Sequence, residues 1–439
     1  MLKAENSLGI IFFPAYDWAI SPTHPEREER LLYTQDQLRE EGLFDIEGIR
    51  EYKPEVAETE DIERVHFCFP EAEAIATRSH YISTGGAIKA AELVMQGERD
   101  RAFALVRPPG HHAMKTVLGS RGFCAVNVEA IMCEHIREKY GQKRIAIIDT
   151  DCHHGDGTQD VYWHDPDTLF ISMHQDGRTI FPGTGFPKDA GGPKALGKNI
   201  NIPLPPGTSD AGFMMVMERI VMPILEDFKP DLIINSAGQD NHFTDPITNM
   251  NFSAQGYAAL TKMLKPHIAV LEGGYAIQGA LPYVNLGISL ALAGVDYSHV
   301  CEPGWNPETL KESDEIMSYI ETLCGSIPDI YFNPPEKSNE GIINGDWSVR
   351  HRNIFYDTEG FTESQTESLL LCNDCRGLLK VQTQKENGPM GFGIEIPIGA
   401  CDKCRNTGYS ILEEAQVKSK FRYMQMINRR EKEYMRYGF

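Results

Sequence analysis

Residues 144–157 read RIAIIDTDCHHGDG, an apolar run that ends in a cluster of acidic and histidine side chains. The apolar part predicts a buried strand, and successive side chains of an extended chain point to opposite sides. Asp149, Asp151 and His153 would therefore leave the end of this strand on the same side. Carboxylates and imidazoles are metal ligands, and open α/β sheets hold their active sites at the carboxyl ends of their strands. This stretch predicts a metal site in an α/β fold.

Strand-like apolar runs alternate with helix-like stretches from about residue 8 to about residue 325. The strand-like runs are 8–13, 102–106, 144–148, 169–172, 232–234 and 268–271, and representative helices are 85–96, 126–139, 211–228 and 253–264. This order predicts an α/β fold with a mostly parallel sheet. Residues 328–360 are rich in Pro, Asn, Gly and Ser and lack periodicity, which indicates a linker or a wrapping arm. We expect a main domain over 1–326, a linker over 327–360 and a small domain over 361–439.

The composition of the 439 residues is that of a globular protein, with 41% hydrophobic and 24% charged residues and a mean hydropathy of -0.34. No apolar run approaches the roughly 20 residues that span a bilayer, so we expect no membrane segment and a cytoplasmic location. The net charge of -21 disfavours nucleic acid as a partner, because phosphate binding depends on Lys and Arg. It suits cationic partners such as lysine-rich tails or polyamines, and solubility alone explains it equally well.

Four further motifs have the character of the strand end at 149–157. They are RPPGHHA at 107–113, GFC at 122–124, SAGQD at 236–240 and LEGGY at 271–275. Together these motifs closely resemble the zinc-dependent histone deacetylase family, which includes the acetylpolyamine amidohydrolases. The resemblance covers roughly residues 8–325. It implies an arginase-like, three-layer α/β fold with a mostly parallel central sheet.

The resemblance implies a catalytic Zn²⁺ held by Asp151, His153 and Asp240. Three protein ligands leave an open position for water and for a substrate carbonyl, as a catalytic zinc site requires. Because two of the ligands are carboxylates, the bound water should be less acidic than at an all-histidine site. A general base is therefore needed.

The same resemblance assigns the proton chemistry to a pair of histidines. It implies that His112 is the general base and that His111 controls the charge of the site. Asp149 and Asp156 would accept the far N–H groups of His111 and His112 respectively, and so fix the orientation of the rings. Tyr275 would donate a hydrogen bond to the oxyanion that develops on the substrate.

Further matches to the family imply a substrate channel and a second ion. Phe123 and Phe181 would form its aromatic walls, and Gly122 would allow a close approach of the acyl-lysine chain. Arg30 would line an acetate exit cavity, and Ile247 stands at a rim position where polyamine-selective relatives carry glutamate. A monovalent-cation site of the family, for potassium, corresponds to Asp149, Asp151, His153, Ser172 and Met173.

The ten cysteines form two groups. Six are scattered along the main domain, which suits reduced thiols in an intracellular protein. Cys372, Cys375, Cys401 and Cys404 form two CxxC pairs that enclose two strand-like runs. Their spacing predicts a structural Zn²⁺ in a zinc-ribbon-like region, and a pair of disulfides or an iron–sulfur site is the alternative.

A basic amphipathic helix is expected after Gly408. Its apolar positions would include Phe421, Met424, Ile427 and Met435, between Lys and Arg residues. Such a helix could pack on the acidic main domain, form a homo-oligomer or bind an acidic partner.

These features predict a zinc-dependent amidohydrolase that removes acetyl or related acyl groups from lysine side chains. Among enzymes, the alternative is hydrolysis of an acetylpolyamine or another small amide. From another class, the alternative is a noncatalytic acyl-lysine reader, although the intact ligand set and Tyr275 speak against it. A binuclear manganese ureohydrolase is disfavoured because the motifs lack its additional bridging carboxylates.

Overall fold

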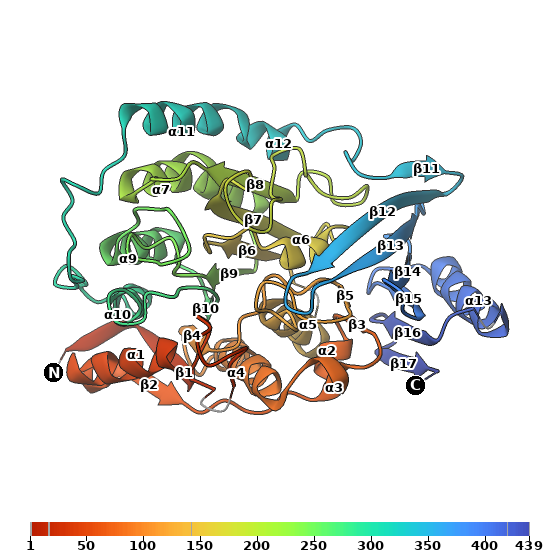
Figure 1. The fold of residues 1–439 in the computed structure, drawn as a ribbon, viewed down its shortest axis with the longest axis horizontal. Helices are drawn as coiled ribbons and strands as arrows, with labels where there is room; N and C mark the ends of the chain where they lie inside the picture. Colours follow the sequence, from red (N-terminus) through yellow and green to blue (C-terminus); the bar gives the residue numbers. More distant parts are fainter. Residues whose placement is uncertain (1, 16–17, 142, 419, 439) are drawn as a thin grey trace.

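A parallel sheet runs through the main body of the protein (Figure 1). The computed structural model describes residues 2–15, 18–141, 143–418 and 420–438. The strands of this sheet are β1 (Lys3–Phe13), β2 (Glu47–Tyr52), β4 (Arg101–Val106), β6 (Ile145–Asp149), β7 (Thr168–Gln175), β8 (Asn199–Leu204), β9 (Leu232–Ala237) and β10 (Ile268–Leu271). They lie in the order β2-β1-β4-β10-β9-β6-β7-β8, with every neighbouring pair parallel. The predicted α/β fold is confirmed.

Helices cover both faces of this sheet, because successive strand residues point to opposite sides. On β1, for example, Leu8 and Ile10 belong to one apolar core and Ile11 belongs to the other. The first core is covered by α1 (Glu29–Glu40), α7 (Asp210–Val216), α8 (Met222–Phe228), α9 (Ala254–Leu264), α10 (Leu281–Ala293), α11 (Asp314–Ser326) and α12 (Pro328–Phe332). The second core is covered by α2 (Thr59–Glu63), α3 (Ala72–Ile75), α4 (Arg78–Met95), α5 (Val128–Tyr140) and α6 (Asp156–Tyr162). The body thus has the three layers that the family resemblance implies.

The helices begin where the sequence offers caps. The Asn127 side chain accepts the Ala130 N–H at the start of α5, and the Ser253 hydroxyl accepts the Gly256 N–H at the start of α9. The helix predicted over 211–228 is α7, a π-helical turn over Met217–Val221 and α8. A short 3₁₀ helix, Leu43–Asp45, and the paired strands β3 (Phe67–Cys68) and β5 (Thr116–Val117) complete the body. Within the described residues, no helix combines the length and the apolar character needed to cross a bilayer.

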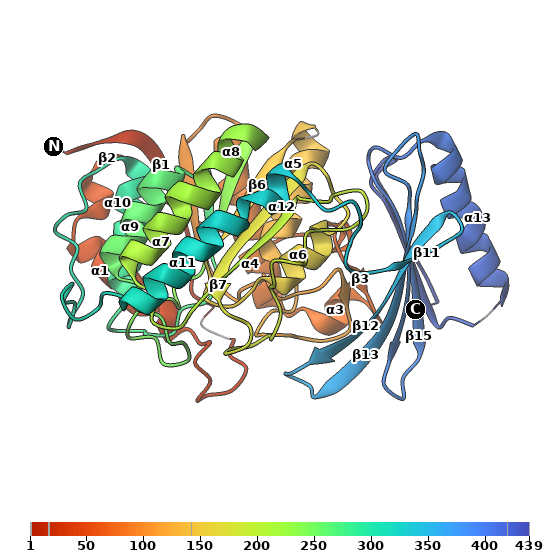
Figure 2. The same ribbon diagram turned by 90° about the horizontal axis from the view of Figure 1, so that it is seen from above.

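The C-terminal part is a second sheet, of seven strands. In order across the sheet these are β11 (Ile342–Asn344), β12 (Trp347–Tyr356), β13 (Phe361–Leu370), β14 (Leu379–Lys385), β15 (Met390–Ile396), β16 (Tyr423–Asn428) and β17 (Glu433–Tyr437). Neighbours are antiparallel except β15 and β16, which are parallel and joined through α13 (Asp402–Lys418). Figure 2 shows α13 on the side of this sheet that faces away from the body.

The structure corrects two expectations for this part. The segment 327–360, expected as a linker or arm, contains α12, β11 and β12, and β12 pairs along its whole length with β13. The helix expected after Gly408 already begins at Asp402 and ends at Lys418. Met424 and Ile427 lie on β16 instead, and Met435 lies on β17. The basic C-terminal segment is therefore part of the sheet.

The face of the C-terminal sheet opposite α13 packs on the body. Phe67 of the body shares an apolar cluster with Val381 and Ile427 of the sheet. A buried ion pair crosses the same boundary, because Lys115 Nζ donates to Glu395 Oε2 at 2.7 Å. Loss of one partner of such a pair would leave a buried charge, which is strongly destabilising. The two parts are therefore packed as one unit.

Candidate active site

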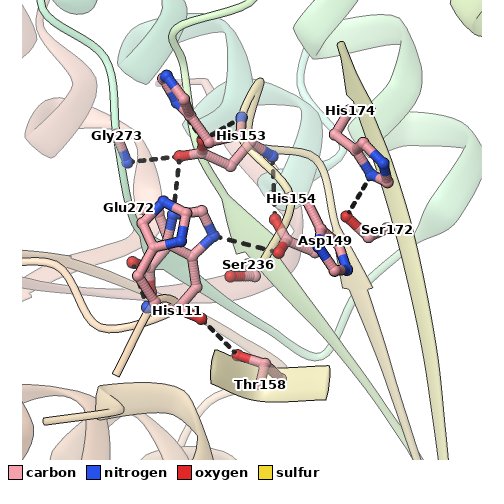
Figure 3. A network of polar contacts seen from close by, with 12 residues as sticks. His111, Asp149, His153, His154, Thr158, Ser172, His174, Ser236, Glu272 and Gly273 are labelled. Atoms are coloured by element: carbon pink, nitrogen blue, oxygen red, sulfur yellow. Dashed lines mark hydrogen bonds and ion pairs between the residues drawn. The ribbon is translucent and has the colours of Figure 1, made fainter. Parts of the chain in front are cut away.

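The loops after four neighbouring strands bring the predicted site residues together. His111 and His112 follow β4, Tyr275 follows β10, Asp240 follows β9, and Asp149 ends β6. These four strands are adjacent in the sheet and parallel, so their carboxyl ends lie along the same edge. Figure 3 shows part of the resulting network of polar contacts, around His111, Asp149 and Glu272.

Asp151, His153 and Asp240 form a buried group of potential metal ligands. Their ligand atoms lie within 4.8 Å of one another, and both carboxylates are completely buried. His153 Nδ1 lies 3.2 Å from Asp151 Oδ1 and 2.8 Å from Asp240 Oδ2. Although burial acts in the opposite direction, the charges of Asp240 and Asp151 raise the pKa of His153 to about 10. The carboxylates of Asp151 and Asp240 therefore stabilise a positive charge that lies between them.

The surroundings of these ligands fit a metal ion. Gly273 passes beside both carboxylates, and a Cβ there would stand 2.5 Å from Asp240 Oδ2 and 2.6 Å from Asp151 Oδ2. Backbone groups fix the ligands: the Gly273 N–H donates to Asp151 Oδ2 and the Cys152 N–H donates to Asp240 Oδ1, each at 2.7 Å. Two carboxylates and one imidazole are three ligands suited to a divalent metal ion, and a set of three protein ligands leaves an open position for water or substrate.

Each histidine of the predicted pair contacts its predicted carboxylate. His111 Nδ1 lies 3.2 Å from Asp149 Oδ2, and His112 Nδ1 lies 2.8 Å from Asp156 Oδ1. Arg121 donates to the other oxygen of Asp156 at 2.6 Å. Burial, together with the charge of His111, lowers the pKa of His112 to about 3. A neutral His112 that donates its Nδ1–H to Asp156 keeps Nε2 as a proton acceptor.

Two buried carboxylates that the sequence left without a role hold these loops. Glu272 accepts the backbone N–H groups of Gly110 at 2.7 Å and His111 at 3.1 Å. Asp245 accepts the backbone N–H of Tyr275 at 2.7 Å. The position of Glu272 inside the LEGGY motif could have indicated that it belongs to the site. The sequence does not reveal, however, which backbone N–H groups donate to a buried carboxylate. Both side chains fix the backbone that carries the predicted catalytic groups.

Tyr275 is buried between an aromatic ring and a guanidinium group. Its ring lies edge-on to Phe123 at a centroid distance of 5.7 Å, and the guanidinium carbon of Arg30 lies 5.0 Å from the ring centroid. Burial raises the pKa of Tyr275 well above its ordinary value, so the side chain is a neutral phenol that can donate a proton. Arg30 Nε donates to the Gly274 carbonyl at 2.7 Å and thereby braces the tyrosine loop. Its place in an acetate exit cavity stays a prediction.

The predicted channel residues lie around the histidine pair. Phe181 is edge-on to His112 at a centroid distance of 5.1 Å. Gly122 has a φ of 51°, and a Cβ there would stand 2.4 Å from His112 Cδ2 and 2.9 Å from Phe181 Cε1. Both the backbone conformation and the space therefore require glycine. Ile247 is 37% exposed, as expected for a residue at the rim.

Comparison with known proteins identifies the family. A model of the histone deacetylase domain matches residues 70–285. A probable deacetylase from Archaeoglobus fulgidus is 47% identical over 332 residues, which are 69% of this chain and 91% of that protein. The chain belongs to the histone deacetylase family.

One further relative and one solved structure are similar to this chain. A histone deacetylase-like amidohydrolase from Pseudomonas aeruginosa is 37% identical over 49% of this chain and 58% of that protein. The crystal structure of the HDA15 HD domain has a TM-score of 0.65 at 24% identity, over 74% of this chain and 97% of that one, which supports the fold alone. As a histone deacetylase family member, the protein is a hydrolytic enzyme of the amidohydrolase type, and the family is metal-dependent.

The potassium site predicted from the histone deacetylase family includes Asp149, Ser172 and Met173, which lie on the adjacent strands β6 and β7. Asp149 of β6 is the register partner of Ser172 of β7. The Ser172 hydroxyl lies 2.8 Å from His174 Nδ1, and Figure 3 shows this pair beside Asp149. The structure thus brings Asp149 and Ser172 together, and the bound ion stays a prediction.

The C-terminal part adds a second candidate metal centre outside the matched histone deacetylase domain. Cys372 Sγ lies 3.9 Å from Cys401 Sγ, and Cys375 Sγ lies 3.5 Å from Cys404 Sγ, all four being free thiols. A tetrahedral ion with Zn–S bonds of about 2.3 Å separates its sulfur ligands by about 3.8 Å. The Gly377 N–H donates to Cys375 Sγ at 3.2 Å. This geometry fits one ion held by four thiolates and not a pair of disulfides.

Proposed function

We propose that this member of the histone deacetylase family is a Zn²⁺-dependent deacetylase that hydrolyses the amide of acetyl-lysine side chains. One observation carries the proposal: a buried ligand trio, two histidines paired with carboxylates and a buried tyrosine converge at the same edge of the sheet. Asp151, His153 and Asp240 would hold Zn²⁺, which when bound polarises the substrate carbonyl and makes a water more acidic.

In this proposal His112 is the general base. Asp156 occupies Nδ1 of the ring, so Nε2 is free to take a proton from the attacking water. The water oxygen bonds to the carbonyl carbon, the C–N bond breaks, and the proton goes from the imidazolium to the departing amine. Proton transfer of this kind contributes roughly 10²–10⁴ in rate. His111 contacts Asp149, and in this proposal it controls the charge of the site beside the reacting groups.

Tyr275 completes the mechanism as a hydrogen-bond donor. Its neutral phenol is fixed in place by Phe123 and Arg30. The hydroxyl donates to the carbonyl oxygen as negative charge develops there, in a site that excludes water and so strengthens the interaction.

The substrate class follows from the channel and the charge. Phe123, Phe181 and Gly122 suit the four methylenes of a lysine side chain, because an aromatic wall and a bare backbone leave a narrow apolar passage. The net charge of -21 favours cationic substrates such as lysine-rich segments. Acetylpolyamines share that charge, and the apolar Ile247 at the rim favours them less. We also assign Zn²⁺ to the four cysteines, since soft thiolates select it.

The substrate assignment is tested by acetate release from an acetyl-lysine peptide and from N-acetylspermidine, with the purified full-length protein. We expect kcat/KM for the peptide to exceed that for the polyamine. The reverse order would assign the enzyme to polyamines, and the absence of hydrolysis of both would contradict the proposed function.

A further inference from the structure

The turn between β12 and β13 of the C-terminal sheet reaches the loop that carries the channel wall. Side chains from the end of β12 and from this turn accept alternate backbone N–H groups of the segment that follows β5. The Tyr356 hydroxyl accepts from Leu118 at 3.3 Å, and the Asp357 carboxylate accepts from Gly122 at 2.9 Å.

Glu359 makes the third contact of this kind. Both of its carboxylate oxygens lie 3.1 Å from the Ser120 nitrogen. A Cβ on the neighbouring Gly119 would stand 2.7 Å from Glu359 Oε2 and 3.2 Å from a Phe361 ring carbon, so the turn lies directly against this loop. Side-chain carboxylates thus bind the backbone at 120 and at 122 and hold it at two points.

This loop has a conformation that needs support. Gly122 has a φ of 51° and Phe123 a φ of 69°, and the left-handed region is costly for a phenylalanine. The Phe123 ring is nevertheless placed in the channel, edge-on to His24 at 4.4 Å and to Tyr275 at 5.7 Å. Any relaxation of the backbone at 122–123 would move this ring.

The residues that flank the turn are packed into the C-terminal sheet. Tyr356 is 1% exposed and stacks on Phe361 at a centroid distance of 4.7 Å. Its hydroxyl donates to Glu363 at 2.9 Å. Tyr356 and Phe361 also share an apolar cluster with Met114 of the body. The contacts to the channel loop are therefore made from a fixed base.

We propose that Asp357 and Glu359 are positioning residues of the substrate channel, through which the C-terminal sheet holds Phe123 in the channel wall. This inference rests on the proposed function for its catalytic consequence. The wall touches the substrate chain and not the reacting amide, so loss of the two carboxylates removes binding that is equal in the ground state and the transition state. Such a loss raises KM and leaves kcat nearly unchanged.

The test uses the full-length double variant Asp357→Ala/Glu359→Ala. We expect KM for the acetyl-lysine peptide to rise about tenfold, which corresponds to about 1.4 kcal/mol of lost binding, with kcat within about threefold of wild type. A hydroxamate with a long alkyl chain should lose affinity by a similar factor, and acetohydroxamate, which does not fill the channel, should not. Asp357→Asn/Glu359→Gln keeps an acceptor oxygen at each position and should restore most of the affinity.

Hydrogen exchange of a peptide covering 118–124 gives a readout that does not depend on activity. The amides of Ser120 and Gly122 should exchange faster in the double alanine variant and not in Glu386→Ala, a control at the exposed β14–β15 turn. If exchange at Ser120 and Gly122 is unchanged in the double alanine variant, Asp357 and Glu359 do not hold this loop. If exchange is faster but KM and hydroxamate affinity are unchanged, the two carboxylates hold the loop but do not position the channel wall. If the wild-type protein hydrolyses no acylated amine, the proposed function fails. Hydrogen exchange of residues 118–124 and the affinity for the long-chain hydroxamate then still test whether Asp357 and Glu359 position the channel wall.

Discussion

Asp240→Ala is expected to abolish hydrolysis and to remove one of two equivalents of bound zinc. The carboxylate is completely buried and lies 2.8 Å from His153 Nδ1, so the remaining ligands, Asp151 and His153, would form an incomplete site. Lewis-acid stabilisation of the transition state is worth several kcal/mol, which corresponds to a loss of about 10³-fold or more in kcat/KM. Metal analysis of the purified variant, together with acetate release, measures both effects.

The reciprocal control for this prediction is Cys372→Ser with Cys401→Ser. It should remove the other equivalent of zinc and destabilise the C-terminal sheet, because a thiolate site contributes its binding energy to folding. The ligand trio should keep its ion. Full metal content in Asp240→Ala, or loss of both ions in either variant while the fold persists, would contradict the assignment of two separate centres.

Tyr275→Phe is expected to lower turnover by about 10²–10³ with little change in KM. The substitution keeps the ring, and therefore its packing against Phe123 and Arg30, and deletes only the hydroxyl. The missing donor matters in the transition state, where negative charge develops on the carbonyl oxygen. Steady-state kinetics on the acetyl-lysine peptide, with metal content as a check on folding, measures this loss.

Tyr331→Phe provides a matched control, because the Tyr331 hydroxyl bonds to Asp227 at 2.8 Å on α8, away from the loops of the site. It should retain wild-type turnover. Wild-type turnover in Tyr275→Phe as well would exclude the phenol as the donor to the developing oxyanion.

The local sequence 144–157 predicts only that potential ligands follow the end of a strand. The pairing of His111 with Asp149 and of His112 with Asp156 was implied by the resemblance to the histone deacetylase family, and the structure contains both contacts. The contacts of Glu272 and Arg121 were not predictable. Which N–H group or carboxylate a buried charge meets depends on loops that are distant in the sequence.

In the C-terminal sheet, β14 and β15 match the two strand-like runs expected between the CxxC pairs, whereas β12 was not predicted. The inward positions of β12 include Ser348 and Arg350, so the strand lacks apolar alternation. Arg350 is tolerated inside because Asp160, from α6, accepts from its guanidinium at 2.9 Å. A strand whose buried polar residues form ion pairs with distant parts of the fold therefore looks like a polar linker in the sequence.

The strand β16 was missed for the opposite reason. Met426 faces the apolar cluster that includes α13, whereas Ile427 faces the cluster shared with the body. Because both sides of the strand are buried, its apolar residues do not alternate with polar ones. Their spacing then resembles a helical period, and the parallel pairing with β15 cannot be inferred from local sequence.

Metal-dependent hydrolysis of an acylated lysine is tested by acetate release from an acetyl-lysine peptide through a cycle of metal removal and return. The purified full-length protein is assayed as isolated, after dialysis against a chelator, and after addition of Zn²⁺, with the bound metal measured at each stage. We expect the isolated protein to hydrolyse the peptide, to lose this activity in step with the metal of the ligand trio, and to regain it with Zn²⁺. Acetate release that persists after that metal is gone, or a zinc-loaded protein that releases none, would contradict this expectation.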